Sequence, residues 1–240
     1  RRLSELDPEE IAREAVRRTA RVLGGRPLPT DRYVLALDPA TVRCELDGVL
    51  ADFGSRHWQI EDVFDQRFLE IAAQLGLDAA AIPLEQRRLI GGYFCHEYSY
   101  AAAAVMNPSV VRHPDQSGLK PGSVRIVIAQ RTVGEGHISS IAFREGIVTT
   151  ERELTLHPAP DMATAAMLTS GAQVASGASF LRRHRESPIS GTVIFPITEA
   201  QRNGLEDLRL VEFHHDDGRR EWIGTYTAYS GGHRRGEIRP

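Results

Sequence analysis

Two acidic residues and an arginine stand close together late in the chain, where Glu206 and Asp207 are followed by Arg209. Alternating apolar residues come next, and an Asp-Gly pair at 217–218 precedes a β-branched and aromatic run at 222–229. Because Asp-Gly is a strong turn signal between strands, this pattern predicts a β-hairpin. The charged side chains then lie at the start of the hairpin, where polar residues often serve a binding site. The alternative is a surface ion pair beside a turn.

These residues resemble the signatures of a known enzyme family. Gly204-Leu-Glu-Asp-Leu-Arg209 and Tyr226-Thr-Ala-Tyr229 are similar to the Gly-x-Glu-Asp-Pro-Arg and Tyr-Thr-Ala motifs of the mannoside phosphorylases and β-mannosidases, glycoside hydrolase family 130. Upstream, Asn107-Pro108, Gln130-Arg131 and Gly136-His-Ile-Ser-Ser-Ile-Ala-Phe143 follow the order that the family uses. The resemblance covers about residues 105–235, and Leu208 stands where proline is commoner.

The resemblance implies inverting cleavage of mannose-containing glycosides, with Asp207 as a general acid that acts through a sugar hydroxyl. Phosphate is already anionic and needs no catalytic base, whereas water needs a second carboxylate, for which Glu135 and Glu206 are the candidates. An oligosaccharide or glycoside is the expected substrate and inorganic phosphate a possible co-substrate, with no cofactor and no metal. The positions matched to the sugar subsite are Asn107, Arg131, Ser139, Ser140, Glu206, Arg209 and Tyr226.

Several of these positions also have a plain structural interpretation. Asn107 with its following proline is compatible with a turn that ends a helix, and Ser139 and Ser140 with strand residues that bond their neighbours. Tyr226 and Tyr229 alternate as core residues of a strand would. Two further patterns fail: His96-Glu97 lacks the second histidine of a zinc protease, and the glycines at 134 and 136 lack the remainder of a nucleotide-binding loop.

Composition narrows the function further. The chain has 41% apolar and 25% charged residues, as an ordinary soluble globular protein does, and its net charge of −3 gives no reason to expect nucleic acid. No apolar run is long enough to cross a membrane, and the charged amino-terminal segment does not resemble a signal peptide. Cys44 and Cys95 are interpreted as reduced thiols, so a cytoplasmic protein is expected.

The hydrophobic period changes along the chain. Helical spacing predicts helices over 7–23 and 57–75, and a third from Pro83 towards Ala104, whereas 26–55 is ambiguous and 33–37 suits a strand or a helix. Later segments predict strands. They are 124–130, a hairpin over 138–148 broken at Glu145-Gly146, and 193–197, with a helix or an insertion at 161–187.

The expected fold is therefore mainly β with an N-terminal α-helical part. Residues 1–104 are expected to form a helical extension, and 105–240 the first blades of a five-bladed β-propeller, too few to close the ring. A fragment, or a chain completed by another component, would explain the missing blades, and a homo-oligomer is possible. Two alternatives stand beside the enzyme: a non-catalytic sugar-binding relative or inactive truncated product, and an interaction protein that uses its helical part.

Overall fold

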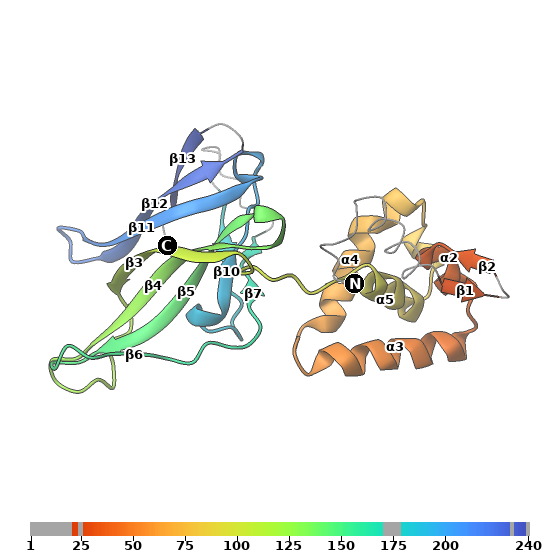
Figure 1. Ribbon diagram of the computed structural model, residues 1–240, viewed down its shortest axis with the longest axis horizontal. Helices are drawn as coiled ribbons and strands as arrows, with labels where there is room; N and C mark the ends of the chain where they lie inside the picture. The colour runs from red at the N-terminus through yellow and green to blue at the C-terminus, as the bar shows by residue number, and fades with distance from the viewer. Residues whose placement is uncertain (1–20, 24–25, 170–178, 231–232, 239–240) are drawn as a thin grey trace. The chain divides into compact units, whose positions relative to one another are not determined.

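The computed structural model describes residues 21–23, 26–169, 179–230 and 233–238 of the 240-residue chain. The chain divides into two compact units, Arg1–Glu97 and Tyr98–Pro240. The described α-helices lie in the first unit and a nine-stranded sheet lies in the second (Figure 1). The expected combination of helices with a large sheet is confirmed, although the described strands close into neither a barrel nor a propeller. None of the described helices is long and apolar enough to span a membrane.

The first unit is a set of short helices with well-defined ends. Helix α3 begins where the Asp38 carboxylate accepts hydrogen bonds of 3.0 Å from the backbone N–H groups of Ala40 and Thr41. Helix α4 ends at Gly76, which adopts the left-handed conformation with φ of 64°. The elements are β1 (Arg21–Leu23), β2 (Arg26–Leu28), α2 (Thr30–Leu35), α3 (Pro39–Gly54), α4 (Ile60–Leu75), the 3-10 helix η2 (Ala79–Ala81) and α5 (Leu84–Tyr93).

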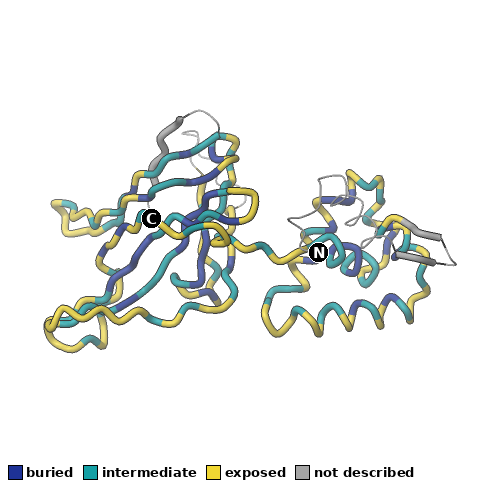
Figure 2. The backbone as a smooth tube through the Cα atoms, viewed as in Figure 1, coloured by how far each residue is buried: buried dark blue, intermediate teal, exposed yellow. Residues whose placement is uncertain are grey.

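A single apolar core holds these helices together. Figure 2 shows the buried residues on their inner faces. Helices α4 and α5 approach closely because Gly91 has no side chain, and a Cβ there would overlap the carbonyl oxygen of Phe64. The buried members of the core are Val34, Val42, Leu46, Phe68, Ile71, Ala72, Ile82, Leu89 and Ile90.

Some of the helix predictions are confirmed and others are wrong. The helix expected over 57–75 is confirmed as α4, and the ambiguous 26–55 segment forms the short strand β2 followed by α2 and α3. The third helix is wrong beyond Tyr93, because residues from Ala104 onward pair with a neighbouring strand instead. The first predicted helix lies mostly outside the described residues, and its last part, 21–23, is a strand.

The second unit contains two antiparallel three-stranded meanders, β3-β4-β5 and β11-β12-β13, which meet at one parallel pair, Gly204 with Ser139. Short strands lie along the edge of β5 that faces away from β4: β6 pairs with residues 146–148, and β10 pairs with residues 141–142 and is itself paired with β7. The main strands are β3 (Ala104–Arg112), β4 (Val124–Val133), β5 (Ser139–Val148), β11 (Gly204–His214), β12 (Arg220–Tyr229) and β13 (His233–Ile238). The remaining elements are η3 (Glu135–His137), β6 (Leu154–Leu156), β7 (Thr164–Ala165), β8 (Met167–Leu168), β9 (Leu181–Arg182), η4 (Ile189–Gly191), β10 (Thr192–Ile194) and η5 (Glu199–Gln201).

The two meanders also touch through side-chain bonds between β3 and the β11-β12 hairpin. The Ser109 hydroxyl accepts a bond of 2.9 Å from the Leu210 N–H, and the Trp222 indole donates one of 2.8 Å to the Arg112 carbonyl. A small apolar core lies between them, with Tyr226 among the residues packed against it. Its buried members are Ala129, Ile141, Leu205 and Leu208.

The strand predictions are better than the helix predictions. The strands expected at 124–130 and around the Asp-Gly turn are confirmed as β4 and as the β11-β12 hairpin. The break predicted at Glu145-Gly146 is wrong, because β5 runs unbroken and Gly146 instead allows β6 to approach: a Cβ there would lie 2.8 Å from the Thr155 carbonyl oxygen. Within 161–187 the described parts hold only short strands.

Candidate functional site

The site is built on two β-bulges that face each other. Asn107 on β3 and Asp207 on β11 have φ angles of 51° and 55°, in the left-handed region that few residues other than glycine adopt. The strand pairing shifts at both positions, so that two residues oppose one on the partner strand. The Asn107 amide Nδ2 donates a hydrogen bond of 2.5 Å to Asp207 Oδ1. Two residues that are 100 positions apart in sequence are therefore joined by their side chains.

Arg131 on β4 connects this pair to two further polar residues. Its guanidinium donates to Glu206 Oε1 at 2.6 Å, to Asp207 Oδ1 at 3.4 Å and to the Ser139 hydroxyl at 3.1 Å. Arg131 lies opposite Ile141 in the antiparallel β4-β5 pair, which makes Ser139 its diagonal neighbour on the same face. Strand register thus determines which serine meets the arginine. We call Asn107, Arg131, Ser139, Glu206 and Asp207 the polar cluster.

The polar cluster is partly sheltered but open to a ligand at one point. The side chains of Arg131 and Glu206 are 20% and 23% exposed, whereas that of Asp207 is 40% exposed. Within the described part of the chain, both side-chain contacts of Asp207 go to Oδ1, which leaves Oδ2 without a protein partner. A fixed carboxylate with one unused oxygen can accept a hydrogen bond from a hydroxyl group, the group that sugars present most.

Gly204 makes room for the polar cluster. Its φ of 151° is unfavourable for other residues, and a Cβ there would lie 2.7 Å from the Ser139 Cβ. Since Ser139 receives the Arg131 hydrogen bond, any side chain at this position would displace a member of the cluster. The glycine that opens the acid motif therefore has a packing reason to be there.

Three predicted site residues lie outside the polar cluster. Ser140 is buried on the opposite face of β5, where its hydroxyl bonds that of Thr132 at 2.9 Å. Arg209 donates to the Pro108 carbonyl at 2.9 Å, which ties the two bulged segments together. Tyr226 packs against the small apolar core, which matches the structural interpretation given for it above. The acid pair itself lies inside β11, at its end farthest from the turn, and not ahead of the hairpin.

Gln201 is a buried residue near the site that sequence reasoning missed. Its Nε2 donates to the Tyr226 hydroxyl at 2.6 Å, and its Oε1 accepts from the backbone N–H groups of Ile197 and Thr198. Tyr226 is the one residue of β12 that lies opposite the bulge at Asp207 and Leu208. Gln201 thus supports the bulge from behind. The Thr-x-x-Gln spacing of 198–201, a capping box, was the signal that could have revealed it.

Glu135, the other carboxylate considered for activating water, lies in η3, where its Oε1 accepts from the Ser99 N–H at 3.3 Å. It is not part of the polar cluster, so Glu206 is the second carboxylate beside Asp207. Among the residues that the structure describes, no three His, Cys, Asp or Glu side chains gather as metal ligands would. Comparisons with models of protein families, with curated proteins and with solved structures find no match to the chain.

Proposed function

We propose that this chain carries the sugar-binding and catalytic residues of an enzyme that cleaves mannose-containing glycosides by inverting phosphorolysis or hydrolysis. The observation that carries the proposal is the convergence of motif residues from four strands. Asn107, Arg131, Ser139 and Asp207 come from separate pieces of the sequence resemblance, yet their side chains form one connected set of hydrogen bonds. Residues that served only their own strands would not be expected to meet in this way.

The chemistry of the polar cluster suits a sugar. Asp207 acts as the general acid and reaches the leaving oxygen through a sugar hydroxyl, as the family resemblance implies. The Asn107 amide and the Arg131 guanidinium both donate to Oδ1 of Asp207, which fixes the orientation of the carboxyl group and therefore of Oδ2. Left-handed backbone at Asn107 and Asp207 supports a functional role, because such conformations concentrate at sites where function requires them.

The fold supports the proposal in a second way. Two antiparallel meanders that pack side by side resemble neighbouring blades of a propeller, so we propose a partial propeller of the five-bladed type. In that arrangement the polar cluster lies where adjacent blades meet. Strands β3 and β11, which carry the two bulges, are in contact across the meanders.

A non-catalytic sugar-binding protein is the second candidate, and the hydrogen bonds that Arg131 already makes favour it over phosphorolysis. Arg131 is engaged by two carboxylates and a hydroxyl, and Arg209 by a carbonyl. All three guanidinium nitrogens of Arg131 are thus bonded within the polar cluster, which leaves Arg131 poorly placed to bind phosphate in this arrangement. A sugar needs only the Asp207 oxygen and the exposed edge of the cluster.

The test is an Asp207→Asn variant assayed on manno-oligosaccharides with and without inorganic phosphate. An amide of equal size should keep sugar binding but lose proton transfer, so turnover should fall about a hundredfold or more. Sugar phosphate as product marks phosphorolysis, and free mannose without phosphate dependence marks hydrolysis. Asp217→Asn, in the exposed hairpin turn, is the matched control.

Wild-type turnover in Asp207→Asn would remove Asp207 from the acid role. Binding of the sugar by calorimetry without turnover in the unsubstituted chain would favour the non-catalytic candidate. Absence of both binding and turnover would reject the carbohydrate proposal.

A further inference from the structure

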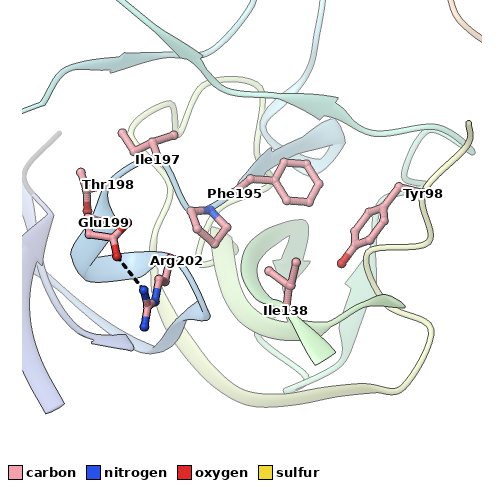
Figure 3. A pocket seen from close by; sticks show the side chains of 8 residues that line it. Tyr98, Ile138, Phe195, Ile197, Thr198, Glu199 and Arg202 are labelled. Carbon is pink, nitrogen blue, oxygen red and sulfur yellow. Dashed lines mark hydrogen bonds and ion pairs between the residues drawn. The ribbon is translucent and has the colours of Figure 1, made fainter. Parts of the chain in front are cut away.

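A pocket of about 640 Å³ lies in the second unit beside the start of β5. This volume suits a small organic molecule. Figure 3 shows Tyr98, Phe195 and Ile138 along its walls, with Glu199 and Arg202 at one side. The remaining lining residues are Pro196, Ile197 and Thr198.

The polar groups of the pocket are already bonded within the protein. The Tyr98 hydroxyl donates to the Glu135 carbonyl at 2.8 Å, and Arg202 pairs with Glu199 at 2.8 Å. The Thr198 hydroxyl accepts a backbone N–H in the capping box of η5. Burial, and then the charge of Glu135, raise the pKa of Tyr98, which keeps its hydroxyl a donor. A ligand is therefore offered mainly apolar surface, which a sugar ring with many hydroxyls would satisfy poorly.

Two aromatic rings form the wall that a flat ligand would contact. Tyr98 and Phe195 meet edge to face, with centroids 5.9 Å apart and an interplanar angle of 72°. Gly134 allows this arrangement, because a Cβ there would overlap the Tyr98 hydroxyl and lie 2.8 Å from the Ser99 carbonyl oxygen. The wall is thus built by a specific close approach of the Tyr98 ring to the β4-β5 connection.

The pocket adjoins the polar cluster along two chain segments. Ile138 directly precedes Ser139, whose hydroxyl receives the Arg131 bond. Arg202 lies two residues before Gly204, which packs directly on Ser139. Both segments run from the pocket wall into the cluster within a few residues, so the pocket and the cluster lie close together in the second unit.

We propose that this pocket binds an apolar aromatic ring, presented as the aglycone of a glycoside whose sugar contacts the polar cluster. The inference rests on the proposed function for the sugar half of the ligand, whereas the aromatic half rests on the pocket alone. The preferred substrate class is then an aryl glycoside rather than an unsubstituted oligosaccharide.

The test compares two sugars that resist cleavage, para-nitrophenyl and methyl thio-β-mannoside, by calorimetry on the 240-residue chain. The aryl compound should bind about tenfold tighter or more, since it alone places a ring in the pocket. Phe195→Ala and the more conservative Phe195→Leu should remove that preference and leave the methyl compound unaffected. Phe213→Ala, at an exposed phenylalanine of β11, is the matched control and should keep the preference.

A second perturbation reaches the same wall from the other side. Gly134→Ala should push the Tyr98 ring away and lower affinity for the aryl compound alone. Circular dichroism establishes that each variant is folded before its affinity is measured.

Equal affinity for the two compounds in the unsubstituted chain would overturn the pocket proposal, as would a preference that survives in both Phe195 variants. A third ligand, para-nitrophenol, separates this failure from failure of the proposed function. If it binds in a Phe195-dependent way while neither thiomannoside binds, the aromatic site is supported, and the glycoside and the proposed function are both overturned.

Discussion

Arg131→Met is the substitution that tests most directly whether the polar cluster is one coupled unit. Methionine keeps much of the length of the side chain but removes the charge and all three donated bonds. Glu206 then loses a partner at 2.6 Å while its side chain is only 23% exposed. Asp207 is solvated more easily than Glu206 in this variant, since its side chain is 40% exposed and its bond to Arg131 is long at 3.4 Å.

The magnitude follows from this comparison. A bond to a charged group contributes about 1.5–3 kcal/mol, and a surface ion pair about 0–1 kcal/mol. Glu206 belongs to the first case and Asp207 to the second. We therefore expect Arg131→Met to lower the free energy of unfolding of the second unit by about 2–4 kcal/mol. Most of that loss should be due to the Glu206 charge, which is left partly buried without its ion-pair partner.

The assay is urea unfolding followed by tryptophan fluorescence. The chain has two tryptophans, Trp58 in the first unit and Trp222 in the second, so a Trp58→Phe background makes Trp222 the reporter of the sheet. Adding Glu206→Gln to Arg131→Met should recover about 1–2 kcal/mol, because it removes the unpaired charge. Arg219→Met, at an exposed ion pair in the hairpin turn, should cost less than about 0.5 kcal/mol. Coupling within the polar cluster is refuted if Arg131→Met costs no more than Arg219→Met, or if the effects at 131 and 206 simply add.

Two further predictions concern stability: one tests a residue that supports the site, and the other tests a helix cap in the first unit. Gln201→Leu should lower the stability of the second unit by about 2–3 kcal/mol, because the Tyr226 hydroxyl and two backbone N–H groups lose their partner. Gln201→Glu keeps an acceptor and should therefore retain most of that stability in the same Trp222 assay. Hydrogen bonds from the Thr41 hydroxyl and then its backbone N–H lower the pKa of Asp38 below 3.8, so its stabilising effect is present above that pH and lost as pH falls through the depressed value. Asp38→Asn should keep the cap yet flatten this acid dependence in unfolding of the first unit, followed by Trp58 fluorescence; an unchanged acid limb would contradict the assignment.

The sequence predicted the strands of the site better than the conformation of its residues. The Asp-Gly turn and the alternation of apolar residues were enough to locate the β11-β12 hairpin. They did not reveal the bulges at Asn107 and Asp207, because one inserted residue disturbs a period-2 pattern too little to be recognised. Nor did they separate Ser139 from Ser140, since the face that each occupies depends on the register with β4. The break predicted at Gly146 was also wrong because it depends on a neighbouring strand. In the sequence alone, a glycine that allows a strand to approach cannot be distinguished from a glycine in a turn.

Bulges make the length of a strand as informative as its composition. At Asp207 and Leu208 two residues oppose Tyr226, and at Asn107 the partner strand is likewise one residue shorter. Deleting one residue at either place would restore regular pairing, with the residues beyond it still opposite their present partners, but it would remove the left-handed position that Asn107 or Asp207 occupies. A deletion would therefore do more damage to the polar cluster than a conservative substitution at the same position, because the local backbone that brings Asn107 and Asp207 together would become regular strand. In proteins that share this arrangement, the spacing between the acid pair and the apolar residues after it should vary less than the residues themselves.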